Sequence, residues 1–179
     1  MNKLFVVSAL LITGTVQAAT TVNGGAVHFS GEFVNAACAV SSDTADQTVI
    51  LGQHRTANIT AVGQYTSNKP VTIKLVYCDT AVSKTAQIAF SGPIDSTDTT
   101  LLKIHSGPSS NATSATGVGI EISDSKGNVL TPDGTVLSTA QTLIDGDNTL
   151  NFMARYKSTA EKATAGKAYA DANFVVTYE

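Results

Sequence analysis

Apolar and polar residues alternate with a period of two along most of this chain. Such alternation puts apolar side chains on one face of a β-strand, and Gly, Asn, Asp or Pro bound the alternating segments, as is typical of turns. The pattern therefore predicts an all-β fold. Seven strands are expected: residues 26–40, 48–51, 71–77, 87–90, 118–123, 148–156 and 168–178. Seven short strands are typical of a β-sandwich.

The N-terminal residues depart from this alternation. Lys3 precedes an apolar run at residues 4–12, and Val-Gln-Ala follows at residues 16–18, which is the order of features in a secretory signal peptide. We expect cleavage after Ala18 or Ala19 and export of the remainder. The run is shorter than the roughly 18–20 apolar residues of a transmembrane helix, and no later segment approaches that length.

The chain contains two cysteines, Cys38 and Cys78. A chain with a secretory signal matures in an oxidising compartment, so we expect an intramolecular disulfide between them. With so few thiols, a structural zinc site is not expected.

Charge and motifs argue against several functions. The net charge is −3, without a basic run, which disfavours nucleic acid and anionic membranes as partners. No nucleophile elbow or phosphate-binding loop occurs, and His28, His54 and His105 lack the paired spacing of metal ligands. We therefore expect no catalysis, no cofactor, no metal and no small-molecule substrate.

The segment near the N-terminus has an apolar face of its own. Gly25, Val27 and Phe29 share one parity, while Ala26 and His28 occupy the other. Adjacent glycines at this point weaken an internal strand, which suits a segment that pairs with another chain. An ordinary first strand starting at a frayed terminus is the alternative.

The last strand also carries an apolar face. Phe174, Val176 and Tyr178 alternate with polar or smaller residues up to the C-terminal Glu179. Burying a Phe or Val side chain contributes roughly 1.5–3 kcal/mol, so a stable domain needs another strand over this face. The pattern alone would fit the last strand of many sandwiches.

Three stretches of the sequence are distinctive: Thr-Thr-Val-Asn-Gly-Gly at 20–25, Val-Asn-Ala-Ala-Cys-Ala-Val at 34–40 and Asp-Gln-Thr-Val-Ile-Leu-Gly-Gln at 46–53. They closely resemble the chaperone–usher pilin family, and most of all its branch of type 1 fimbrial major subunits. Ala154-Arg155-Tyr156 matches as well, as does the C-terminal pattern with Gly166 fourteenth from the end and Tyr178 penultimate. The resemblance extends over essentially the whole mature chain.

This resemblance implies an incomplete immunoglobulin-like sandwich, completed by a donor strand from another subunit or from a chaperone. It divides the chain into a signal peptide (1–18), a donor-strand extension (19–30) and a pilin domain (31–179). The donor positions it implies are Val22, Gly25, Val27 and Phe29. The positions it implies for the terminal strand that binds the chaperone are Gly166, Phe174, Val176, Tyr178 and Glu179.

The same resemblance implies a structural role in a type 1-like fimbria on the bacterial surface. Its expected partners are identical or related pilins, a periplasmic chaperone and an outer-membrane usher. A minor adaptor or terminator pilin is an alternative, since it shares the fold and assembly. A sugar-binding adhesin is a weaker one, because the pilin-like pattern starts right after the signal and leaves no room for a separate binding domain.

Overall fold

The computed structural model describes residues 21–33, 35–108 and 112–179. The expected signal peptide, residues 1–18, lies outside this part of the chain. Two units separate along the sequence, Met1–Phe33 and Val34–Glu179, and the sheets belong to the second.

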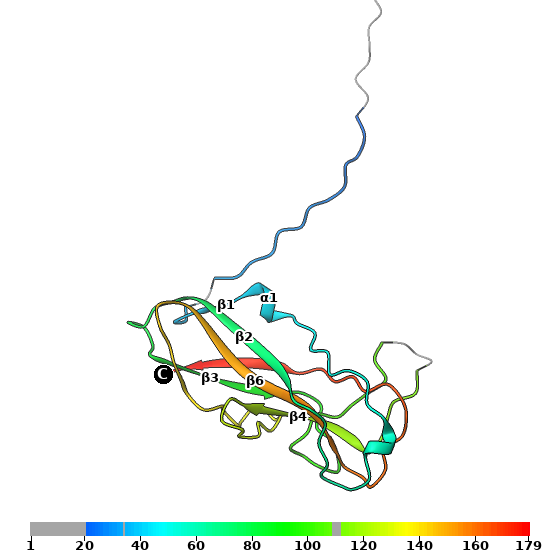
Figure 1. The fold of residues 1–179 in the computed structure, drawn as a ribbon. Helices are drawn as coiled ribbons and strands as arrows, with labels where there is room; N and C mark the ends of the chain where they lie inside the picture. The colour runs from blue at the N-terminus through cyan, green and yellow to red at the C-terminus, as the bar shows by residue number, and fades with distance from the viewer. Residues whose placement is uncertain (1–20, 34, 109–111) are drawn as a thin grey trace, which may run out of the picture. The chain divides into compact units, whose positions relative to one another are not determined.

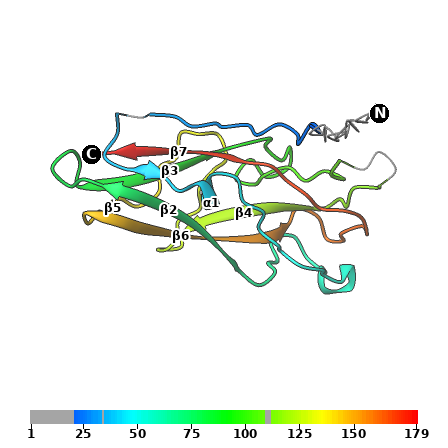
Figure 2. The same cartoon turned by 90° about the horizontal axis from the view of Figure 1, so that it is seen from above.

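The second unit contains two antiparallel sheets (Figures 1 and 2). The four-stranded sheet has the order β1 (Ala39–Val40), β2 (Lys69–Cys78), β6 (Gly146–Ser158) and β4 (Val118–Asp124). The three-stranded sheet has the order β5 (Gln141–Thr142), β3 (Thr85–Ser91) and β7 (Asn173–Tyr178). One short helix, α1 (Ser42–Ala45), and one 3-10 turn, η1 (Thr56–Asn58), lie between β1 and β2. The all-β prediction is therefore confirmed.

The long strands form where alternation is strongest. In β2, Ile73 and Leu75 are fully buried while Lys74 between them points outward. β2 pairs with β6 from Lys69 opposite Ala154 onward, and β6 pairs with β4 on its other edge. Because side chains alternate between faces, one face of this sheet supplies half of the core.

The core lies between the two sheets. Phe152 of β6 and Phe90 of β3 meet edge to face, with ring centroids 5.3 Å apart, a favoured geometry for aromatic pairs. Other buried members come from both sheets, among them Ile73, Leu75, Ile88, Ile120, Ile122 and Leu150. Phe174, Val176 and Tyr178 of β7 pack against the same cluster but are only partly buried.

The predicted disulfide is present. Cys38 precedes β1 and Cys78 ends β2, and their Cα atoms lie 4.1 Å apart. The bridge closes a sequence separation of 40 residues, which the chain-entropy model values at about 4 kcal/mol. It therefore fastens the start of the domain to the long β2 strand.

Two predicted strands near the start of the chain are wrong in whole or in large part. Residues 48–51 form no strand, and among the described residues of 26–40, which exclude residue 34, only Ala39–Val40 belongs to one. After Val40 the chain stays beside β2, but helix α1 and single hydrogen bonds replace the strand pairing. The Ser41 N–H donates to the Lys74 carbonyl, and Gln47 Nε2 donates to the Thr72 carbonyl. Residues 48–51 pair with no described strand. Alternation creates a strand only where a neighbour supplies main-chain partners.

The predicted last strand, residues 168–178, starts later than expected. β7 begins at Asn173, which pairs with Ser91 at the end of β3. Beyond Ser91 the neighbouring chain continues into Gly92 and Pro93, and Gly92 bonds to Pro132 instead. Because β3 stops there, residues 168–172 lose their partner in the sheet. β5, only two residues long, was not predicted.

Candidate strand-accepting groove

β7 is the edge strand of its sheet. One of its edges pairs with β3, from Ala86 opposite Tyr178 to Ser91 opposite Asn173. Within the described ranges no strand pairs with the other edge. An edge of this kind presents free N–H and C=O groups that can pair with an added strand.

An apolar groove opens beside this edge. Its volume is about 1890 Å³, whereas small-molecule pockets occupy roughly 300–1,000 Å³. Buried side chains of both sheets form its floor, including Ile73, Phe90 and Ile122. The groove is therefore an opening into the hydrophobic core, wide enough for a segment of polypeptide.

Two segments outside the sheets border the groove. Residues 47–55 lie on one side and residues 163–172 on the other, and both contribute to its lining. In Figure 2 they are the blue-green stretch after α1 and the orange-red stretch before β7. We call residues 163–172 the groove wall. The wall leads directly into β7, so the two form one continuous border.

Main-chain hydrogen bonds hold the groove wall along one edge. Lys167 exchanges bonds with Thr113 and Ala115, each 2.8 Å long, and Tyr169 exchanges bonds of 2.7 and 3.0 Å with His105. In an extended chain the main-chain groups of the alternate residues, such as Ala168, point to the opposite edge. That edge faces the groove.

One side chain on the groove floor also reaches the wall. The hydroxyl of Tyr156, from β6, donates a 2.7 Å hydrogen bond to the Ala168 carbonyl. Burial raises the pKa of Tyr156, so this hydroxyl stays a donor at neutral pH. The resemblance had singled out Tyr156 by its motif, but the sequence did not reveal this contact.

The C-terminal end of β7 is fixed to both sheets. A main-chain oxygen of Glu179 accepts hydrogen bonds from the N–H groups of Lys84 and Thr85, both 2.9 Å long. The Tyr178 hydroxyl donates to the Cys38 carbonyl at 3.3 Å, next to β1. Burial raises the pKa of Tyr178. The end of the chain is thus ordered on the domain without an added strand.

The predicted residues of the terminal strand fall into two groups. Gly166 and Phe174 line the groove itself. Val176 and Tyr178 lie further along β7, where they pack against the core. Their role in binding a chaperone stays a prediction.

The predicted donor residues lie in the first unit. Residues 21–33 form neither helix nor strand. Phe29 is 94% exposed and Val27 77%, and Val22 is similarly exposed. Gly25 has a φ of 111°, a conformation that residues with side chains rarely adopt. Exposed apolar residues in such a row suit a segment that is covered by another molecule, and strand donation stays a prediction.

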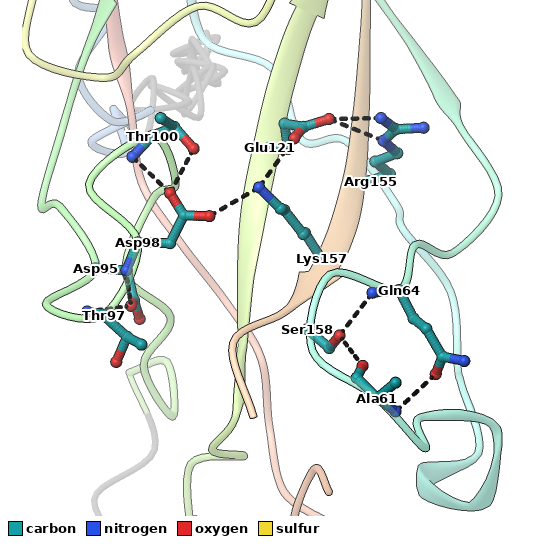
Figure 3. A network of polar contacts seen from close by, with 10 residues as sticks. All are labelled: Ala61, Gln64, Asp95, Thr97, Asp98, Thr100, Glu121, Arg155, Lys157 and Ser158. Carbon is teal, nitrogen blue, oxygen red and sulfur yellow. Dashed lines mark hydrogen bonds and ion pairs between the residues drawn. The ribbon is translucent and has the colours of Figure 1, made fainter. Parts of the chain in front are cut away.

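A charged cluster supports the sheet on the face away from the core (Figure 3). Glu121 of β4 lies directly opposite Arg155 of β6 and is 1% exposed. Arg155 donates two hydrogen bonds to Glu121 Oε1, at 2.9 and 2.7 Å, and its guanidinium lies 3.6 Å from the Tyr65 ring centroid. Sequence analysis missed this cluster because strand register, which brings the two charges together, is not visible in the sequence.

Lys157 extends the cluster to a loop. Its Nζ lies 2.8 Å from Asp98 Oδ2 and 3.9 Å from Glu121 Oε2. The hydrogen bond to Lys157 lowers the pKa of Asp98, and the same bond raises the pKa of Lys157. Charge compensation of this kind is what permits a buried carboxylate such as Glu121.

Among the residues that the structure describes, no group of three or more His, Cys, Asp or Glu side chains is placed to hold a metal ion. None of the helices in this part of the chain has the length and apolar character needed to cross a membrane.

Several known proteins are similar to this chain in sequence and in fold. The profile of the family described as fimbrial protein matches residues 27–179. The "Type-1 fimbrial protein, A chain" of Salmonella typhi is 50% identical over 97% of this chain and 95% of its own length. A subunit in the structure of a chaperone–usher pilus, reported for rod uncoiling, superposes with a TM-score of 0.72 and 32% identity over 90% of this chain and 100% of its own. The P pilus rod subunit PapA superposes with a TM-score of 0.66 and 31% identity, over 80% and 100% of the two chains.

The incomplete sandwich with its open groove is thus the fold of a pilus subunit, and the chain belongs to the fimbrial protein family. Within that family it is a structural subunit of the type 1 kind, exported to form fimbriae on the cell surface. The resemblance drawn from the sequence is confirmed, and with it the immunoglobulin-like fold class.

Proposed function

We propose that this subunit polymerises into the shaft of a fimbria by donor-strand exchange. The groove beside β7 accepts the N-terminal extension of another copy, which we assign to residues 19–30, while residues 31–179 form the accepting domain. The observation that carries this proposal is the groove itself, which opens the core along an unpaired strand edge.

Strand addition explains why both elements have these sequences. Main-chain bonds to a free edge supply affinity, and alternate side chains entering the groove supply register. Val27 and Phe29 provide the apolar side chains, and Gly25 permits close approach of the donor backbone. The donor strand would complete the cover over Phe174 and Val176, which one chain leaves partly exposed.

Identical copies would then form an open filament. Each chain has one donor segment and one accepting groove, so every junction leaves a donor free at one end and a groove free at the other. A head-to-tail contact that does not close into a ring grows without limit. The role is structural, and the proposal assigns no catalytic step to the chain.

An exposed groove requires protection before assembly. We assign this to a periplasmic chaperone that lends a strand beside β7, with contacts at Phe174, Val176, Tyr178 and the C-terminal Glu179. Replacement by the next subunit would take place at the outer-membrane usher. An exposed apolar groove favours aggregation, which is the physical reason for such a chaperone.

The first test removes the donor. A mature subunit that lacks residues 20–29, co-expressed with its chaperone, should still bind the chaperone but form no filaments by electron microscopy and gel filtration. Phe29→Asp should act in the same way, because a charge cannot enter the apolar groove.

His28→Asp is the matched control, since His28 occupies the opposite parity of the same segment. It should assemble like the unaltered chain. Filaments from the truncated subunit, or equal loss of assembly in both point variants, would contradict the proposal.

A further inference from the structure

Several glycines lie close to the groove wall, and among them Gly92 and Gly166 are the two with an ordinary φ. An ideal Cβ at Gly166 would lie 2.3 Å from the Ala115 nitrogen and 2.5 Å from the Ser114 carbonyl carbon. An ideal Cβ at Gly92 would lie 2.6 Å from the Asp171 carbonyl oxygen and 2.7 Å from Leu102 Cδ2. Both glycines have an ordinary φ, so space alone decides what a side chain would cost there.

These contacts fall at both ends of the groove wall. Gly166 belongs to the wall and meets the neighbouring residues 113–115, while Gly92 meets the wall at residues 171–172. Most of the atoms involved are main chain, which cannot rotate away as a flexible side chain does. Added atoms must therefore displace a segment, because protein interiors have little free volume.

The groove wall can move only toward the groove. Hydrogen bonds from Lys167 and Tyr169 hold one edge of the wall against neighbouring chain, and the opposite edge borders the groove. On the groove side the Tyr156 hydroxyl contacts the Ala168 carbonyl, and the remaining space there belongs to the open groove. An added methyl group at either glycine would therefore push the wall into the groove and narrow it.

We propose that Gly92 and Gly166 are positioning residues that set the width of the groove. They allow the wall to lie back against its neighbours, and so leave room for an incoming strand. This inference rests on the proposed strand exchange and goes beyond it, because it identifies what keeps the accepting site open.

The test measures the rate of strand insertion. The mature subunit in complex with its chaperone is mixed with an excess of a fluorescent peptide of residues 20–33, and peptide uptake is followed by anisotropy. Gly92→Ala and Gly166→Ala should each slow uptake by about tenfold, because the added methyl group overpacks the contact and displaces the wall. A tenfold change corresponds to about 1.4 kcal/mol.

Gly119→Ala is the matched control. Its added Cβ would lie 2.9 Å from Leu101 Cβ, so it also overpacks the domain, but it meets residues 101–102 and not the wall. It should lower the melting temperature without slowing uptake. If all three variants slow peptide uptake equally, general destabilisation of the domain explains the slowing, and the inference is overturned.

A smaller peptide gives a second readout. A narrowed groove slows the uptake of bulky peptides most. With the unaltered peptide, the unaltered subunit should therefore take up peptide faster than the Gly166→Ala subunit. With a peptide that carries Phe29→Ala, the two uptake rates should become nearly equal. A ratio of the two rates that is the same for both peptides would contradict a change in groove width.

Ala170→Val keeps the inference testable if the glycine variants are not recovered. Ala170 lines the groove, so the larger side chain narrows it from within and leaves the glycine contacts unchanged. It should slow uptake with the same dependence on peptide size, and unchanged uptake would overturn the inference. Failure of the unaltered subunit to take up any peptide would instead count against strand exchange itself.

Discussion

β6 and β7 are both apolar strands of one sandwich, but only β6 has partners on both edges. β2 and β4 flank it, and its inward residues Leu150 and Phe152 are almost inaccessible. β7 pairs on one edge, and its inward residues Phe174 and Val176 remain partly exposed although they pack on the same core.

The two strands show that the same alternation of apolar and polar residues can serve two purposes. Alternating apolar residues stabilise β6 within one chain, because neighbouring strands cover them. In β7 the same alternation leaves apolar surface for a strand that the domain itself does not supply. Edge strands are ordinarily protected against added chains, so an open apolar edge beside a groove indicates an assembly surface.

The largest effect should come from truncating the covered strand. Phe152→Ala should lower the free energy of unfolding by about 3–5 kcal/mol, because it leaves a cavity in the core. Phe174→Ala should lower it by less, about 1–2 kcal/mol, since a partly buried side chain contributes less than a fully buried one. Urea denaturation of the monomeric subunit measures both, and equal losses would remove the contrast between the strands.

Loss of the disulfide should rank next. The double variant Cys38→Ala/Cys78→Ala should lose about 4 kcal/mol, since the unfolded chain regains the entropy of the open loop. Treating the unaltered chain with a reducing agent should lower its urea midpoint by the same amount. If the reducing agent also lowers the midpoint of the double variant, the loss of stability does not come from the disulfide.

The charged cluster should give an intermediate effect. Arg155→Ala leaves the buried Glu121 carboxylate without its main donor, which should cost about 2 kcal/mol. Lys74→Ala is the control, because the Lys74–Asp43 pair is half-exposed and such pairs contribute about 0–1 kcal/mol. A loss in Lys74→Ala as large as in Arg155→Ala would argue against a special role for the cluster.

The smallest effect should depend on pH. Burial acts to raise the pKa of Asp124, but hydrogen bonds from Thr139 and Asn128 outweigh it and hold the pKa well below its usual range. The folded pKa therefore lies below the unfolded value of about 3.9. A group shifted in this direction stabilises the fold above the unfolded pKa, and that stability is lost as pH falls through the folded pKa.

Asp124→Asn should remove this dependence. Near pH 7 the variant should be less stable than the unaltered chain by about 1.5 kcal/mol, the lower end of the range for hydrogen bonds to a charged group. The difference should shrink as pH falls below about 4. Urea titrations at several pH values test this, and a difference that is constant with pH would contradict it.

The sequence predicted the strands that the chain completes by itself. Residues 71–77, 87–90, 118–123 and 148–156 all lie within observed strands. Residues 48–51, 26–33 and 35–38 carry the same kind of pattern but form no strand. Periodicity reports which face of a segment is apolar, whereas pairing depends on a neighbour that the pattern does not specify.

The site was predictable in part, and for the same reason. The apolar rows at both ends and the cysteine pair were visible in the sequence. The groove wall, the Tyr156–Ala168 bond and the Glu121–Arg155 pair depend on which segments the fold brings together. Gly166 was noted by its position, but its close approach to residues 113–115 required coordinates.

Donor-strand exchange requires above all that residues 19–30 of one copy fill the groove of another. The most direct measurement appends these residues through a flexible linker after Glu179, so that the chain can fill its own groove, and compares melting temperature and assembly. Two or three newly buried apolar side chains should raise the melting temperature by roughly 10 °C or more and abolish filament formation. A control with Asp at the appended copies of Val27 and Phe29 should behave like the unaltered chain. An unchanged melting temperature together with continued filament growth would contradict the account.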